Sequence, residues 1–212
     1  MKETLLIFGD SWPNGCELKN NEKPFGQILA EENNLKYKNY SQDGASNSHL
    51  PLQLKQAIKE EQSKNSIAIF FLTSYTRTIN WKDPQENKSL NAAGLRDIDQ
   101  MYSKYFYTDE LGLFNTAQCV LSLQKICETF SIDDYYVPGW LNFDFTFPGI
   151  ALTKIFNKGQ NNIAHEIGMP DFSVEINGEY NNHHLIFPSN YHPNQKAHKL
   201  ISKKLNNWIF KK

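Results

Sequence analysis

The chain has 212 residues with 22 Lys plus Arg against 23 Asp plus Glu, a net charge of −1, and this balance excludes the strongly basic footprint of nucleic acid binding proteins. Its three cysteines form no metal-ligand spacing, and their odd number argues against a disulfide framework, so a reducing, cytoplasmic compartment is expected. Its apolar runs are shorter than the roughly 20 residues of a membrane span. The apolar stretch among its first residues is also too short for a signal-peptide core, which has about 7 to 15 residues. We therefore expect no nucleic acid or membrane partner.

The first 74 residues alternate between strand and helix patterns. Continuous apolar runs at 4–9 (TLLIFG) and 66–74 (SIAIFFLTS) are typical of strands buried on both faces. Between them, 24–34 and 49–62 have the apolar spacing of helices, and 36–40 (KYKNY) is a short strand. This alternation is that of βαβ units and predicts a parallel sheet.

The second half continues the pattern with longer interruptions. Residues 109–130 predict a long helix, 134–140 a short strand, and 192–210 an amphipathic final helix with Pro193 in its first turn. The stretches 78–106 and 141–188 have weak periodicity and are interpreted as insertions or long loops over the strand ends. We expect one domain covering residues 1–212.

The first predicted strand ends abruptly at Gly9, Asp10 and Ser11. Ligands of open parallel sheets bind outside the carboxyl ends of the strands, and Ser11 is predicted to lie there. Gly9 permits a backbone bend that a residue with a Cβ would resist, and Asp10 is interpreted as a structural hydrogen-bond partner. A serine needs a nearby base to act as a nucleophile, and His192, just before the final helix, is the candidate.

These stretches resemble the sequence blocks of the SGNH, or GDSL-like, hydrolases. FGDSW is similar to the first block, with Ser11 at the nucleophile, and NYSQDGASN to the second, with Asn39 and Gly44 at its N-x-x-x-x-G spacing. HPNQKAH is similar to the last block and puts His192 at the base. The resemblance implies an α/β, three-layer αβα fold with a flavodoxin-like parallel sheet, and esterase or acyl hydrolase activity without cofactor or metal. It also implies that the N–H groups of Ser11 and Gly44 bind the oxyanion.

The chain departs from the family at the residue that orients the histidine. The last block of the family reads Asp-x-x-His, whereas here Ser189 stands three residues before His192. The substitutes considered are the Ser189 hydroxyl, a backbone carbonyl, or a carboxylate from Asp144 or Asp171.

A second departure concerns the oxyanion donor. The third block of the family reads Gly-x-Asn-Asp after a strand, and here 70–77 reads FFLTSYTR. Asn47 or Ser74 is a candidate replacement for the missing asparagine. Arg77 holds anionic charge more strongly than an amide does, which indicates either an acidic group on the substrate or a structural ion pair.

Other conspicuous residues have simpler explanations. His183 and His184 are adjacent and would point to opposite faces of a strand, so no metal site is expected there. Cys16 is interpreted as a small buried residue because nothing cationic nearby favours a thiolate. The tryptophans could either line a sugar or acyl pocket or pack in the core; these are Trp12, Trp81 and Trp140.

The sequence therefore predicts a serine hydrolase that cleaves a carboxylic ester of a small molecule or glycan, including an O-acetyl group on a sugar. Ser11 attacks the acyl carbon and His192 transfers the proton. Two alternatives use the same site: acyl transfer to an acceptor other than water, and ligand binding without turnover in a degenerate member. A third is an accessory protein of viral origin, based on similarity to short SGNH-like proteins of phage genomes. The oligomeric state is left open.

Overall fold

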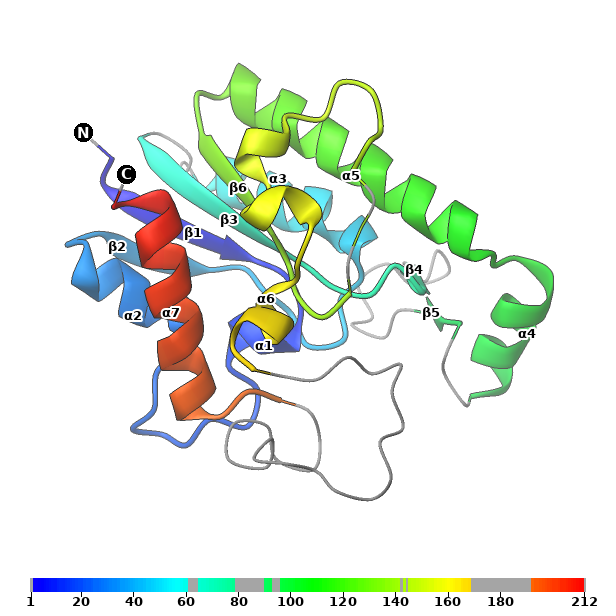
Figure 1. Cartoon of the computed structure of the whole chain (residues 1–212), viewed down its shortest axis with the longest axis horizontal. Helices are drawn as coiled ribbons and strands as arrows, with labels where there is room; N and C mark the ends of the chain where they lie inside the picture. The colour runs from blue at the N-terminus through cyan, green and yellow to red at the C-terminus, as the bar shows by residue number, and fades with distance from the viewer. Residues whose placement is uncertain are drawn as a thin grey trace.

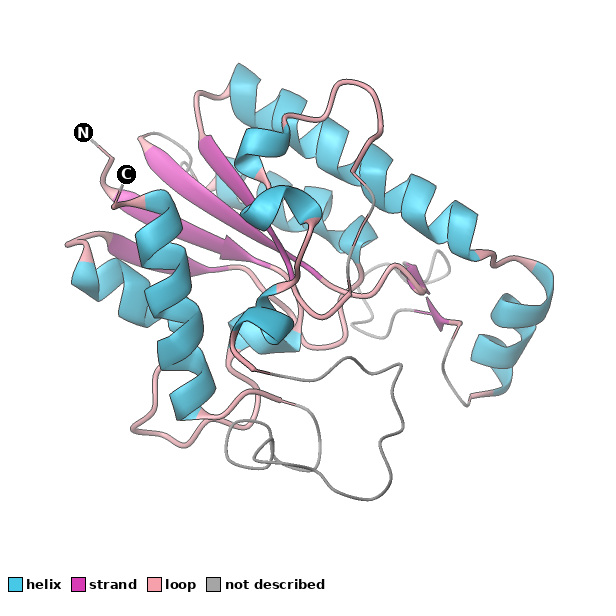
Figure 2. Cartoon of the chain, in the orientation of Figure 1, coloured by secondary structure: helices cyan, strands magenta, loops and turns pink. Residues whose placement is uncertain are grey.

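Four parallel strands form the central sheet in the order β2-β1-β3-β6. The computed structural model describes residues 2–60, 65–78, 90–92, 96–141, 143, 145–168 and 192–211. The strands are β1 (Thr4–Phe8), β2 (Lys36–Asn39), β3 (Ser66–Leu72) and β6 (Asp133–Pro138). The first strand, β1, lies between β2 and β3, which is the flavodoxin-like order. The predicted parallel sheet is confirmed (Figure 2).

The burial of each strand explains its sequence. Every residue of β1 and β3 is buried, which accounts for their continuous apolar runs. Strand β2 lies at one edge, and its residues alternate between exposed and half-buried. Beyond β6, Ile155 forms an isolated parallel bridge with Tyr136, at the place where a fifth strand would pair with β6.

Helices cover both faces of the sheet, which confirms the three-layer αβα arrangement (Figure 1). The two layers consist of α2 (Phe25–Glu32) with α7 (Gln195–Ile209), and α3 (Leu50–Lys59) with α5 (Asp109–Thr129). Leu5 and Ile7 of β1 pack into the core under α2 and α7, whereas Leu6 and Phe8 pack under α3 and α5. Alternate side chains of one strand therefore supply two cores.

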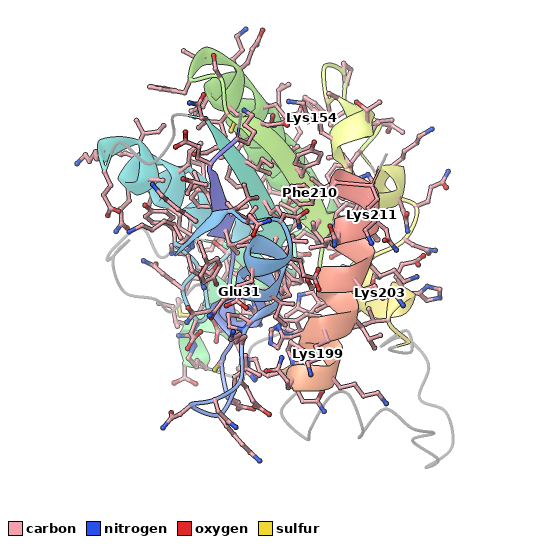
Figure 3. All side chains as sticks on the ribbon, turned by 90° about the vertical axis from the view of Figure 1, so that its left-hand side faces the viewer. Glu31, Lys154, Lys199, Lys203, Phe210 and Lys211 are labelled. Carbon is pink, nitrogen blue, oxygen red and sulfur yellow. The ribbon has the colours of Figure 1, made fainter. Side chains whose placement is uncertain are left out.

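The final helix begins later than the sequence predicts. Asn194 is its N-cap and accepts hydrogen bonds from the N–H groups of Lys196 and Ala197 at 3.0 and 3.1 Å, so His192 lies two residues before the cap. Lys199 and Lys203 lie on the outer side of α7, as Figure 3 shows. The amphipathic pattern thus places the buried face of α7 on the sheet, as expected.

The two stretches interpreted as irregular contain short elements, which corrects that interpretation for the described residues. The first holds a two-stranded hairpin and a helix: β4 (Arg77–Thr78), β5 (Leu90–Asn91) and α4 (Asp97–Tyr105). The second holds η2 (Leu152–Lys154), η3 (Phe156–Gly159) and α6 (Ile163–Glu166). Only Asp99 of α4 is buried, and its apolar residues Ile98, Met101 and Tyr105 are exposed.

The residues between β2 and α3 contain one further turn of helix, η1 (Asn47–His49). Ser46 and His49 form a reciprocal capping box at its start. Within the described part of the chain, no helix has the length and apolar composition needed to cross a membrane.

Candidate active site

A tight turn presents Ser11 at the carboxyl end of β1, where the short helix α1 (Ser11–Asn14) begins. Gly9 has φ 151°, and a Cβ on it would lie 2.7 Å from Pro13 Cγ and 3.0 Å from Phe71 Cβ. Only glycine fits this position without displacing those neighbours. Asp10 is the N-cap of α1 and accepts a hydrogen bond of 3.2 Å from the Trp12 N–H. The close packing of Gly9 and the hydrogen bond of Asp10 therefore hold the backbone of the turn just before Ser11.

Gln53 of α3 holds the same turn from below. Its Oε1 accepts from the Gly9 N–H and its Nε2 donates to the Gly9 carbonyl, both at 2.9 Å. The side chain is only 3% exposed, so these two bonds form in the core. Gln53 is not among the site residues predicted from the sequence. The sequence feature that could have identified it is its position: it is a polar residue on the buried, otherwise apolar face of α3, three positions after Leu50.

His192 lies directly against Ser11, although 181 positions separate them in the chain. Its Nε2 is 3.0 Å from Ser11 Oγ, a hydrogen-bond distance. Ser11 is 7% exposed and the His192 side chain is 23% exposed. The two residues that the sequence puts forward as nucleophile and base are thus adjacent and partly shielded from solvent.

The other imidazole nitrogen faces a carboxylate that sequence reasoning missed. Glu17 Oε1 is 3.5 Å from His192 Nδ1, and the Glu17 side chain is 38% exposed. Glu17 adopts a left-handed backbone conformation with φ 69°, which is uncommon for a residue other than glycine. No sequence signal marks it, because it follows the nucleophile rather than preceding the histidine. The substitutes considered earlier for this role lie outside the described residues, namely Asp144, Asp171 and Ser189.

The loop after β2 is tied to α1 by side-chain hydrogen bonds. Asn39 Nδ2 donates to the Pro13 carbonyl at 3.0 Å, and Asp43 Oδ1 accepts from Asn14 Nδ2 at 2.9 Å. Gly44 follows in the left-handed region with φ 74°, where a glycine is favoured. The two stretches that resemble the first two family blocks therefore form one connected strand-end structure.

Comparison with solved structures decides the fold class. A G-D-S-L family lipolytic protein from Veillonella parvula superposes with a TM-score of 0.53 at 12% identity, over 99% of each chain. The psychrotrophic esterase EstA from a Pseudoalteromonas species, solved with monoethylphosphonate as inhibitor, gives 0.58 at 13% identity over 99% of this chain and 98% of EstA. The acetyl xylan esterase AlAXEase gives 0.53 at 7% identity over 97% and 100%.

The chain has the SGNH hydrolase fold. No profile of a protein family matches the sequence, and no curated protein sequence matches it either. Superposition on structures with 7 to 13% sequence identity establishes the fold alone, so the activity has to be argued from the site.

Within this SGNH fold, the end of β3 differs most from the family pattern. Asn47 donates both amide hydrogens, to the Thr73 carbonyl at 3.1 Å and to Thr116 Oγ1 at 3.2 Å, and accepts from the Thr73 N–H at 2.8 Å. The Ser74 hydroxyl lies 2.6 Å from Thr76 Oγ1 and accepts from the Thr76 N–H at 3.2 Å. Both candidate donors thus brace the loop after β3.

Arg77 lies beside the nucleophile turn rather than in open solvent. Its Nη1 is 3.5 Å from Asp10 Oδ2 and 3.3 Å from Thr73 Oγ1, and its guanidinium carbon lies 5.5 Å from the Trp140 ring centroid. Burial raises the pKa of the Asp10 carboxyl, and the Arg77 charge opposes this rise. The structure therefore favours the interpretation of Arg77 as a member of a structural ion pair, with Asp10 as its partner.

The remaining conspicuous residues divide between core and site. Trp12 is fully buried in the core, with its ring 5.1 Å from that of Trp140. Cys16 is half-buried rather than buried, and burial together with the Asp43 carboxylate raises the pKa of its thiol. Trp81, His183 and His184 lie outside the described ranges.

A surface pocket of about 350 Å³ opens next to the imidazole. Glu17, Lys19 and Glu22 line one side, and residues 192–196 line the other. It lies on the side of His192 that carries Glu17. The site therefore has a hydrogen-bonded Ser-His pair with a carboxylate and a solvent-accessible space at its edge.

Proposed function

We propose that this protein is a serine esterase in which Ser11 is the nucleophile, His192 the general base and Glu17 the carboxylate that orients the imidazole. The observation that carries the proposal is the distance of 3.0 Å between Ser11 Oγ and His192 Nε2. A serine paired in this way with a histidine, itself next to an acid, is the arrangement required for nucleophilic acyl transfer.

The reaction follows from these positions. His192 Nε2 takes the proton from Ser11 as Oγ attacks the acyl carbon, which gives a tetrahedral intermediate with a negatively charged oxygen. The Ser11 N–H is in the first turn of α1, where helical hydrogen bonding leaves N–H groups available, and it donates to that oxygen together with the Gly44 N–H. The imidazolium then protonates the leaving alcohol, and a water molecule hydrolyses the acyl-enzyme by the same steps.

Glu17 takes the role that an aspartate before the histidine has in the family pattern. Its charge stabilises the imidazolium that forms during attack. The separation of 3.5 Å is longer than a hydrogen bond, and catalytic contacts often tighten when substrate binds. The acid would thus come from the segment after the nucleophile.

The substrate class we propose is a carboxylic ester on a small molecule or a glycan, including a sugar O-acetyl group. Two structural neighbours support this choice: an esterase and an acetyl xylan esterase. Acyl transfer to another acceptor would use the same residues and differ only in what attacks the acyl-enzyme.

A second candidate is a binding protein that does not turn its ligand over. It is favoured by the missing asparagine after β3 and by the engagement of Asn47 and Ser74 in structural hydrogen bonds. Loss of one oxyanion donor costs about 10²- to 10³-fold in turnover. In that case Ser11 and His192 would hold the ligand without acylation.

Hydrolysis of p-nitrophenyl acetate by the full chain and four variants tests the two candidates. The esterase predicts turnover that falls to the background rate in Ser11→Ala and His192→Ala. Two exposed residues of the same types, Ser103 and His165, provide controls, and Ser103→Ala and His165→Ala are expected to match the wild type. No turnover in any folded sample, or equal turnover in all five, would overturn the proposal.

A further inference from the structure

Three potential metal ligands of different chemistry converge on the far side of the imidazole from Ser11. One ligand atom from each of Cys16, Glu17 and His192 lies within 4.8 Å of the other two. They come from two segments, the turn after α1 and the residues before α7. The proposed esterase reaction uses two of these residues and leaves the thiol unused.

The separation between the glutamate and histidine atoms is close to that in a zinc site. Zinc bonds of about 2.3 Å to sulfur and about 2.0 to 2.2 Å to nitrogen or oxygen place tetrahedral ligand atoms roughly 3.4 to 3.6 Å apart. Glu17 Oε1 and His192 Nδ1 are already 3.5 Å apart. That distance exceeds the usual range of an N–H···O hydrogen bond, about 2.7 to 3.2 Å. Without bound substrate, the spacing of the pair therefore also suits two ligands of one ion.

A second observation points to the same place. His192 Nδ1 is a buried atom and makes no hydrogen bond to any described residue. A buried ring nitrogen without a partner is unusual, because such groups are normally paired. Here it faces a carboxylate and lies next to a thiol, two groups that a cation would bring into bonding contact with it.

The local charge also favours a cation. Two carboxylates, those of Glu17 and Asp43, lie close enough to act electrostatically on the Cys16 thiol. Thiolate and imidazole ligands select zinc over magnesium or calcium, which prefer oxygen ligands alone. Three protein ligands leave the fourth tetrahedral position to water.

We propose that Cys16, Glu17 and His192 Nδ1 form an inhibitory Zn²⁺ site. Ligation uses the Nδ1 lone pair, so the ring proton moves to Nε2, and the Cys16 thiol releases one proton to solvent. Nε2 then carries a hydrogen and cannot accept the proton of Ser11. The binding part stands on the three ligands alone, whereas the inhibition rests on the proposed esterase function.

The test uses the full chain, stripped of metal with a chelator and then titrated with Zn²⁺. Zinc binding is measured by competition with a chromophoric chelator, and p-nitrophenyl acetate hydrolysis is followed in the same samples. We expect one Zn²⁺ per chain, with activity lost in parallel with occupancy, and no loss when Mg²⁺ replaces Zn²⁺. Activity of each variant is expressed relative to its own metal-free rate.

Two ligand variants and one control separate the site from general zinc binding. Cys16→Ala and Glu17→Gln should each weaken Zn²⁺ binding at least about 10-fold, the lower end of what even a supporting residue contributes to a zinc site. Glu22→Gln alters a carboxylate of the neighbouring pocket and should leave the affinity unchanged.

Equal zinc affinity in wild type, Cys16→Ala and Glu17→Gln would overturn the metal site. Ligand-dependent binding without loss of hydrolysis would overturn its inhibitory role. If no ester is hydrolysed at all, the competition measurement still decides the metal site, and the failure belongs to the proposed function.

Discussion

Glutamine at position 17 would remove the charge beside His192 while keeping the size of the side chain. At the observed separation of 3.5 Å, one unit charge stabilises another by about 1.2 kcal/mol in water and about 4.7 kcal/mol at an effective dielectric constant of 20. The two side chains are 23% and 38% exposed, so the lower half of this range applies. A loss of about 1.4 to 2.7 kcal/mol in the transition state corresponds to about 10- to 100-fold in rate.

The assay is kcat/KM for p-nitrophenyl acetate in metal-free buffer, measured for wild type, Glu17→Gln and Glu22→Gln. We expect kcat/KM to fall about 10- to 100-fold in Glu17→Gln and to stay within twofold in Glu22→Gln. Glu22 lines the same pocket, but among the described residues the ion pair of His192 is with Glu17. Added salt should slow the wild type more than Glu17→Gln, since salt screens exposed charges. A Glu17→Gln enzyme as fast as wild type would refute the role of this carboxylate.

Two stability predictions follow from buried polar groups. Gln53→Leu leaves the Gly9 N–H unpaired in the core, whereas the Gly9 carbonyl keeps its hydrogen bond from the Gln42 N–H. This variant should lower the free energy of unfolding by about 1 to 3 kcal/mol in urea, with slower ester hydrolysis; an unchanged urea midpoint would contradict this. His198 is fully buried, which lowers its pKa to about 4, so the unfolded chain binds a proton below about pH 6.5 that the folded chain binds only near pH 4. The free energy of unfolding should therefore fall by about 3 kcal/mol between pH 7 and pH 4 on account of His198, and His198→Gln should lack this part of the decline; parallel pH profiles of the two proteins would contradict the assignment.

The sheet and its main helices could be predicted because burial leaves a direct mark on the sequence. Strands β1 and β3 are buried on both faces, so their runs are continuously apolar. The pairing of Ser11 with His192 is predictable from the resemblance of FGDSW and HPNQKAH to the first and last SGNH blocks, and the two side chains lie 3.0 Å apart. Burial does not explain the sequence of helix α4: Ile98 and Met101 are exposed, whereas Asp99, which binds Arg96 and the Asn91 N–H, is buried.

The parts of the site that could not be predicted depend on backbone geometry and long-range contacts. Glu17 reaches His192 from a turn in which Gly15 has φ 78° and Glu17 itself φ 69°, and no residue pattern encodes that path. Gln53 contacts Gly9 across 44 positions. Arg77 had two interpretations, and only the position of Asp10 next to it distinguishes them.

Mass-spectrometric mapping of a fluorophosphonate adduct tests the central claim most directly. The account predicts a single adduct on Ser11 in the wild type, and labelling that is lost in folded His192→Ala because Oγ then has no base within reach. An adduct on any other residue, or labelling of His192→Ala at the wild-type rate, would contradict it.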